Sequence, residues 1–229
     1  MGLGEADASP AYGESPDRVP SMIRQALKRL AGHDPFDLEG LSDRLDGAFG
    51  GYASVRAAVD TAFHDLAAQR AGLPLHAFLG IASGPLPSTS FTIGMDSPEG
   101  VYQKTLRAVW QGFKILKVKL GGPQDEALIR AVRRGFHGKL QVDANGGWTL
   151  ARARRLLPLL KREKVFLIEQ PFPRGHLGAT RLFARGCPIP VFLDEDVHGA
   201  ADIPGLRGVC AGVNLKLMKT GGIRGALRA

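Results

Sequence analysis

The chain has 229 residues, 44% of them hydrophobic and 23% charged, which is the composition of an ordinary soluble globular protein. It has no run of about 18 apolar residues, which excludes a transmembrane helix, and only two cysteines, which excludes a disulfide scaffold and favours a reducing, cytoplasmic compartment. The net charge of +8 rests mostly on arginines spread over helical stretches, so a solvated helix face explains it better than nucleic-acid binding.

The first part of the chain, residues 1–85, is predicted to be a small region that contains helix. Residues 1–20 are rich in Gly, Pro, Ser and acidic side chains, which indicates a loop or the end of a broken strand. Apolar residues from Ala53 to Gly72 recur at three- and four-residue spacing, which predicts an amphipathic helix. Ile81–Ser88 contains Gly and Pro residues and is predicted to link this region to a second one.

Beyond Ser88 the pattern changes to short apolar runs that alternate with Arg-, Ala- and Leu-rich helical stretches. Strand-sized runs separated by helix-sized spacers predict βα units and a parallel sheet. Two of the intervening helices are predicted at Pro123–Arg134 and Thr149–Glu163. The predicted strands are Ser90–Ile93, Phe113–Leu120, Leu140–Val142, Val165–Ile168, Pro190–Leu193 and Val213–Leu217.

Chargeable residues stand late in these runs or directly after them, and they return about every 25 residues, once per βα unit. In a closed barrel they would gather at the C-terminal mouth, where barrel enzymes hold their catalytic groups. An open doubly wound sheet would spread them along an edge, but no GxGxxG follows the first strand to support that fold. The residues are Lys117, Lys119, Asp143, Glu169, Asp194 and Lys216.

Three of these residues, Asp143, Glu169 and Asp194, are carboxylates that follow successive strands. Carboxylates that are crowded together repel one another unless a cation holds them, and an all-oxygen ligand set suits Mg²⁺. The alternative is that each acid caps the helix that follows it. Their joint occurrence at equal spacing favours the metal site.

Two lysines, Lys117 and Lys119, lie two residues apart on one predicted strand, so their side chains leave the same face. Either they extend to solvent at the strand end, or Lys117 and the metal lower the pKa of Lys119 so that it abstracts a proton. Lys216 would face Lys119 across the barrel. Two bases beside Mg²⁺ describe removal of a proton alpha to a carboxylate through an enediolate.

Four further residues attract attention because of their type or position. Asn145 and Asn214 either reach this site or satisfy backbone groups at strand ends. His64 and Trp148 are expected to be packing residues rather than ligands, and the histidines show no metal-binding pattern.

Taken together, these motifs resemble the enolase superfamily in its muconate-lactonizing subgroup. The resemblance rests on Lys117-Val118-Lys119, Asp143-Ala144-Asn145 with Trp148, Glu169-Gln170-Pro171, Asp194-Glu195 and the stretch from Asn214 to Gly222. It implies an α/β fold with a (β/α)7β TIM-like barrel, here incomplete with about six strands, in residues 86–229. Residues 1–85 would then be a partial α+β N-terminal capping domain.

Within the subgroup, the stretches Thr92–Glu99 and Lys216–Gly222 most resemble dipeptide epimerases of the L-Ala-D/L-Glu type. The resemblance implies that Lys119 and Lys216 are the two acid/base lysines, that Lys117 assists, and that Asp143, Glu169 and Asp194 bind Mg²⁺. The substrate would be a dipeptide, and a homo-oligomer is compatible with the family. Muconate cycloisomerase and o-succinylbenzoate synthase share the same lysines and ligands and remain alternatives.

The chain departs from the family's pattern because it ends at Ala229, just after the Gly221-Gly222 turn. We therefore expect the last two barrel strands, an acidic DxD motif after them, and the first capping strands to be missing. Asp194-Glu195-Asp196 is not that DxD motif, since Asp194 matches a metal ligand. A catalytically incomplete fragment is thus a second hypothesis, and a Schiff-base lysine enzyme is a third.

Overall fold

The computed structural model describes residues 1–229 and divides the chain into two compact units. The first unit comprises Met1–Pro85, His198–Pro204 and Leu215–Ala229, and the second comprises Leu86–Val197 and Gly205–Asn214. Two short segments from late in the sequence therefore pack with the N-terminal region. That the predicted domains 1–85 and 86–229 are the functional divisions of the chain stays a prediction.

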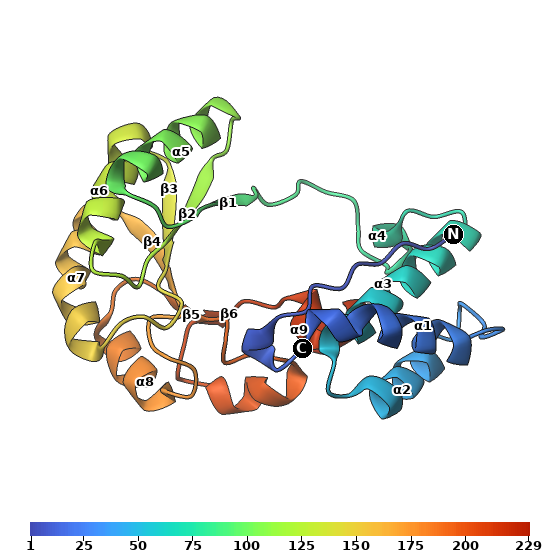
Figure 1. The fold of residues 1–229 in the computed structure, drawn as a ribbon. Helices are drawn as coiled ribbons and strands as arrows, with labels where there is room; N and C mark the ends of the chain where they lie inside the picture. The colour runs from blue at the N-terminus through green and yellow to red at the C-terminus, as the bar shows by residue number, and fades with distance from the viewer. The chain divides into compact units, whose positions relative to one another are not determined.

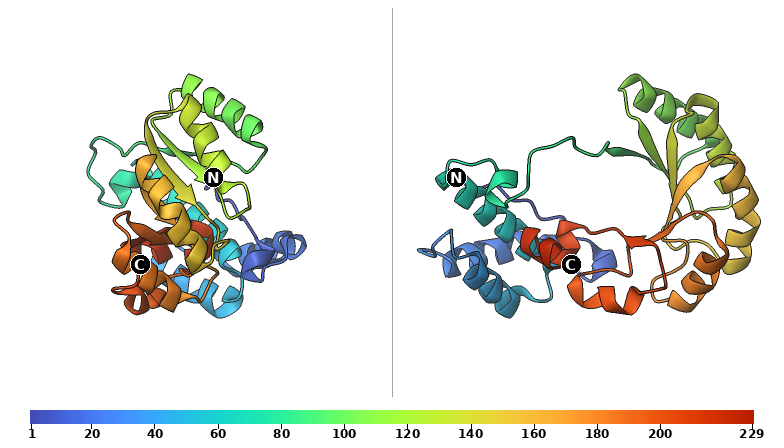
Figure 2. Two further views of the ribbon diagram at one scale, coloured as in Figure 1. Left: turned by 90° about the vertical axis from the view of Figure 1, so that its left-hand side faces the viewer. Right: turned by 180° about the vertical axis from the view of Figure 1, so that it is seen from behind.

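The second unit is built on one parallel sheet whose strands follow one another in chain order, from β1 to β6. Its helices, α5 to α8, lie along one face of the strands (Figure 1), and the view from behind in Figure 2 shows the same layering. This is the βα repeat predicted from the alternating runs. The strands are β1 (Ser90–Ile93), β2 (Ile115–Lys119), β3 (Lys139–Asp143), β4 (Val165–Glu169), β5 (Val191–Leu193) and β6 (Gly212–Val213). The helices are α5 (Pro98–Trp110), α6 (Asp125–Gly135), α7 (Leu150–Arg162) and α8 (Leu177–Gly186).

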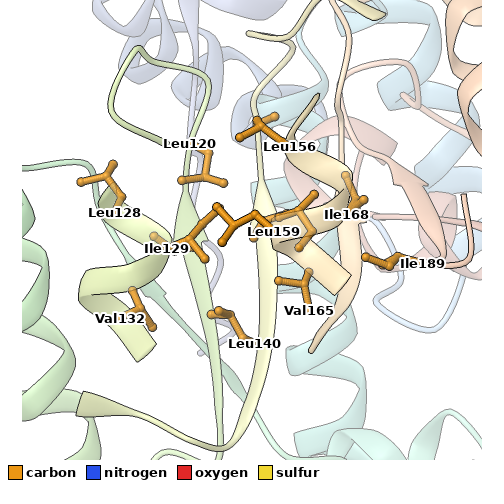
Figure 3. Packing of buried hydrophobic residues seen from close by; sticks show 14 of the residues in the cluster. Leu120, Leu128, Ile129, Val132, Leu140, Leu156, Leu159, Val165, Ile168 and Ile189 are labelled. Atoms are coloured by element: carbon orange, nitrogen blue, oxygen red, sulfur yellow. The ribbon is translucent and has the colours of Figure 1, made fainter. Parts of the chain in front are cut away.

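Apolar side chains from the helices and from the covered face of the sheet form one continuous core (Figure 3). Ile129 and Val132 of α6 and Leu156 of α7 belong to it together with Leu140 of β3 and Ile168 of β4, and all five are buried. Burial of each large aliphatic side chain stabilises the fold by about 1.5–3 kcal/mol. The opposite face of the same strands carries polar side chains, among them Lys117 and Glu169, together with apolar ones such as Leu167.

The first unit contains helices and no strand. The helix predicted from Ala53 is present as α3 (Ala53–Arg70), and Ile81–Ser88 has no regular secondary structure, as predicted for a linker. No helix in either unit is long and apolar enough to cross a membrane. The other elements are η1 (Pro10–Tyr12), η2 (Pro16–Arg18), α1 (Val19–Arg29), α2 (Leu38–Phe49), α4 (Leu75–Phe78), η3 (Ala200–Leu206), α9 (Leu217–Thr220) and α10 (Ile223–Arg228).

The sixth strand differs from its prediction. The apolar run Val213–Leu217 was expected to be a strand carrying Lys216, but β6 pairs with β5 only through Gly212 and Val213. Lys216 instead precedes α9 as its N-terminal cap residue, and its carbonyl accepts the amides of Lys219 at 2.9 Å and Thr220 at 3.0 Å. The chain turns into a helix here, and Leu217 is already its first residue.

Candidate active site

The predicted carboxylates lie at the carboxyl ends of adjacent strands because the parallel register aligns them. Lys119 of β2 is opposite Asp143 of β3, and Asp143 is opposite Glu169 of β4. Glu169 is in turn opposite Phe192 of β5, two residues before Asp194. All three carboxylates are buried, with exposures of 0% for Asp143, 3% for Glu169 and 1% for Asp194.

Lys117 provides the positive charge between two of these acids. Its ammonium Nζ lies 3.1 Å from Asp143 Oδ2 and 3.2 and 3.1 Å from the two carboxylate oxygens of Glu169. Burial opposes the charge of this ammonium, but the charges of Glu169 and Asp143 outweigh burial and raise the pKa of Lys117 above its ordinary value. Lys117 is therefore a fixed cation at neutral pH.

Lys119 joins the same cluster from a position two residues further along β2. Its Nζ lies 2.7 Å from Asp143 Oδ2, while the backbone amide of Asn145 donates to Asp143 Oδ1 at 3.0 Å. Both lysines thus leave the same face of the strand and meet one carboxylate, as the two-residue spacing predicted. Lys119 is more accessible than Lys117, with side-chain exposures of 27% and 14%.

Glu169 also receives two neutral donors, from Gln141 and Asn214. Gln141 Nε2 donates to Oε2 at 3.2 Å and Asn214 Nδ2 donates to Oε1 at 2.8 Å. Asn214 therefore reaches this cluster, one of the two interpretations open for it, and Asn145 Nδ2 binds Glu195 Oε1 at 3.1 Å. Gln141 was missed, although its place two residues before Asp143 puts it on the same face of β3.

Gln170 stands in the Glu169-Gln170-Pro171 motif, but the sequence did not predict a role for its side chain. Its backbone has φ +38, in the left-handed region, and its side-chain Oε1 accepts the amides of Asp194 at 2.9 Å and Glu195 at 3.1 Å. Its Nε2 donates to Asp196 Oδ2 at 2.6 Å. Gln170 thereby ties the end of β4 to the segment that carries Asp194.

The loops above β2 and β3 are joined by a buried carboxylate, Asp125, at the start of α6. Its Oδ1 accepts the amides of Gly121 at 2.9 Å and Gly122 at 3.0 Å, and its Oδ2 accepts Trp148 Nε1 at 2.7 Å. Arg152 Nη2 lies 3.1 Å from the same oxygen. Trp148 is a packing residue, as expected, and it also orders the loop that follows Asp143.

The donor chemistry of Asp143, Glu169 and Asp194 fits a hard divalent cation, since every available ligand atom is a carboxylate oxygen. No three His, Cys, Asp or Glu side chains are grouped so as to share an ion in this structure, where lysine charges balance Asp143 and Glu169. The helix-capping alternative is wrong for these two acids, because Thr149 precedes α7 as its cap residue and His176 precedes α8.

The structure thus brings Lys117, Lys119, Asp143 and Glu169 into direct contact and sets Asp194 at the end of the neighbouring strand. Lys216, the remaining predicted site residue, belongs to the first unit, where it is half-buried at the start of α9.

Comparison with known proteins agrees with this fold. Residues 101–229 match the enolase C-terminal domain-like family, and residues 1–80 match the N-terminal domain of the mandelate racemase/muconate lactonizing enzyme family. The chain therefore belongs to the enolase superfamily, in its mandelate racemase/muconate lactonizing group.

Among the relatives, dipeptide epimerases are prominent. An L-Ala-D/L-Glu epimerase of Bacteroides thetaiotaomicron is 36% identical over 227 residues, which are 98% of this chain and 58% of that protein. A dipeptide epimerase of Cytophaga hutchinsonii, crystallised with Mg and D-Ala-L-Val, superposes with a TM-score of 0.91 at 33% identity, covering 99% of this chain and 64% of that one.

A dipeptide epimerase of Enterococcus faecalis, crystallised with Mg and L-Leu-L-Tyr, gives a TM-score of 0.93 at 32% identity, covering 99% of this chain and 66% of that one. The chain thus spans about three fifths of the length of the relatives it matches.

Proposed function

We propose that this chain carries the proton-transfer site of a Mg²⁺-dependent dipeptide epimerase, which inverts the α-carbon of the C-terminal residue of its substrate. The observation that carries the proposal is the contact of Lys119 with Asp143, beside Lys117 and Glu169, at the carboxyl ends of adjacent parallel strands. Catalytic groups of barrel enzymes stand at this end of the strands. Relatives that are named dipeptide epimerases support the substrate class.

Asp143, Glu169 and Asp194 are the residues that would hold the metal. When bound, Mg²⁺ supplies Lewis acidity that stabilises the extra negative charge formed on the substrate carboxylate when its α-proton leaves. The all-carboxylate donor set and the burial of all three side chains support this assignment.

Lys119 and Lys216 are the residues that would move the proton. In its neutral form, Lys119 Nζ accepts the α-proton, and the electron pair of the broken C–H bond moves into the carboxylate. Lys216 Nζ, in its ammonium form, then donates a proton to the opposite face of the same carbon. In the reverse direction the two lysines exchange roles, so no other reactant is consumed.

Lys117 would stay protonated throughout. Its raised pKa and its contacts with two buried carboxylates suit a residue that supplies fixed positive charge rather than one that exchanges protons. Residues 86–229 would form a partial barrel around this site, and residues 1–85 would be part of a capping domain.

The test is epimerisation of a dipeptide panel, measured as formation of the second diastereomer by chiral chromatography. The panel contains L-Ala-L-Glu and hydrophobic dipeptides, with Mg²⁺ or with EDTA. We expect Mg²⁺-dependent turnover that Lys119→Ala abolishes and that Lys114→Ala, at an exposed position on the approach to β2, leaves unchanged.

Two other outcomes would replace the proposal. Mg²⁺ binding by calorimetry without any turnover would identify a catalytically incomplete fragment. Conversion of a muconate or of an o-succinylbenzoate precursor, without epimerisation, would assign another activity of the muconate-lactonizing type.

A further inference from the structure

A buried ionisable pair on α3 has no part in the proposed chemistry. Asp60 and His64 lie one helical turn apart, with exposures of 2% and 1%. His64 Nδ1 is 3.3 Å from Asp60 Oδ2 and 2.8 Å from the carbonyl oxygen of Asp60. Burial opposes a charge on the imidazole, but the hydrogen bonds to Asp60 and its negative charge outweigh burial and raise the pKa of His64.

The same carboxylate binds the backbone of a segment far along the chain. Asp60 Oδ2 accepts the amide of Ile223 at 2.7 Å and that of Arg224 at 3.4 Å, at the start of α10. Gly222, just before them, has φ +115, and a Cβ atom at this position would collide with the Asp60 carboxylate. Only glycine allows the backbone to approach the acid so closely.

A continuous series of hydrogen bonds leads from this contact back to Lys216. The amide of Gly222 donates to the carbonyl of Leu217 at 2.9 Å, and Thr220 Oγ1 donates to the carbonyl of Gly222 at 3.1 Å. The amides of Thr220 and Lys219 in turn donate to the carbonyl of Lys216. The α9 helix packs on α3, so the backbone of Lys216 is tied to the helix that carries Asp60.

We propose that Asp60, paired with His64, is a positioning residue that holds the segment 216–224 and thereby the backbone of Lys216. The holding itself depends only on the contacts described, whereas its catalytic consequence rests on the proposed function of Lys216 as a base. A charged acceptor for the buried amide of Ile223 and the partly buried amide of Arg224 is worth more than a neutral one, so the carboxylate is suited to this role.

Hydrogen–deuterium exchange on the full chain tests the holding without any substrate. We expect Asp60→Ala to speed exchange of the amides in 216–224 by about tenfold or more, with unchanged protection in β2, β3 and β4. Asp60→Asn retains one acceptor oxygen and should show a smaller increase if Asp60→Ala proves too unstable to study. Asp43→Ala, at an exposed position on α2 of the same unit, is the matched control and should change nothing. Unaltered exchange of 216–224 in both Asp60 variants would overturn the proposal.

Solvent deuterium uptake by each epimer of an accepted dipeptide tests the link to Lys216. With two bases on opposite faces of the α-carbon, Lys216→Ala should reduce deuterium uptake by one epimer more than by the other. Lys119→Ala should show the opposite preference. Asp60→Ala should share the preference of Lys216→Ala and lower kcat while leaving KM nearly constant. An equal loss for both epimers would refute the link. If the unmodified chain acts on no dipeptide, the proposed function fails, while the amide-exchange result still decides whether Asp60 holds the segment.

Discussion

Replacement of Lys117 by Met removes the cation between two buried carboxylates while keeping most of the side-chain volume. At 3.1 Å and an effective dielectric constant of 20, each ammonium–carboxylate contact is worth about 5 kcal/mol before desolvation is counted. Removing one partner of a buried ion pair typically costs about 3–5 kcal/mol. Asp143 keeps Lys119 and Glu169 keeps two amide donors, so we expect the lower end, about 3 kcal/mol.

Urea unfolding at pH 7, followed by circular dichroism, measures this loss as a change in the free energy of unfolding. The pKa of Lys117 is raised, so its contribution to stability is fully present below its ordinary value of about 10.4 and disappears only as the pH rises through its folded-state pKa. Lys114→Met, at an exposed position just before β2, is the control and should stay within about 0.5 kcal/mol of the unmodified chain. A loss below about 1 kcal/mol for Lys117→Met would show that the Lys117 ammonium is not tightly paired with Asp143 and Glu169.

Three further changes test other parts of the structure. Trp148→Phe should lower stability by about 1–2 kcal/mol, because the bond from indole Nε1 to Asp125 Oδ2 is lost; thermal melting should show no comparable effect for Trp110→Phe, whose side chain is 87% exposed. His64→Gln should lower the free energy of unfolding most below about pH 6.5, and the loss should fade as the pH rises through the raised pKa of His64. Denaturant titrations across pH measure this, and a loss of stability that grows with pH would contradict the buried pair. Gly121→Ala should lower the free energy of unfolding, measured in urea, by about 2 kcal/mol or more. The reason is that Gly121 has φ +107 and that a Cβ there would lie 2.5 Å from the carbonyl oxygen of Ala144, in the loop after β3.

The repeating part of the fold was accessible from sequence because short stretches rich in apolar residues alternate with longer helical stretches. The carboxylates could be located for the same reason, since they directly follow those runs and parallel register then aligns Asp143 with Glu169. The two-residue spacing of Lys117 and Lys119 likewise fixed their common face. These features depend on local patterns that the backbone geometry of a strand translates directly into position.

Other features depend on contacts between distant segments, which local patterns do not encode. The sequence of Val213–Leu217 fits the end of a strand and the start of a helix equally well. The amides of Lys219 and Thr220 donate to the carbonyl of Lys216, and these hydrogen bonds form the helix. The left-handed backbone of Gln170, and the hydrogen bond that its side chain accepts from the amide of Asp194, likewise depend on the neighbouring strand. His64 has no sequence signal for its partner beyond the spacing to Asp60, and the bond from Asp60 to Ile223 crosses most of the chain.

Deuterium incorporation at the α-carbon of the C-terminal residue is a direct test of proton transfer by Lys119 and Lys216, because it reports proton removal whether or not the product inverts. The chain is incubated in D₂O with an accepted dipeptide and Mg²⁺, and uptake is followed by mass spectrometry. We expect Mg²⁺-dependent uptake of one deuteron, which is lost when Lys119 and Lys216 are both replaced by Ala and retained in Lys114→Ala. A folded, Mg²⁺-binding chain that takes up no deuterium from any dipeptide in the panel would contradict the assignment.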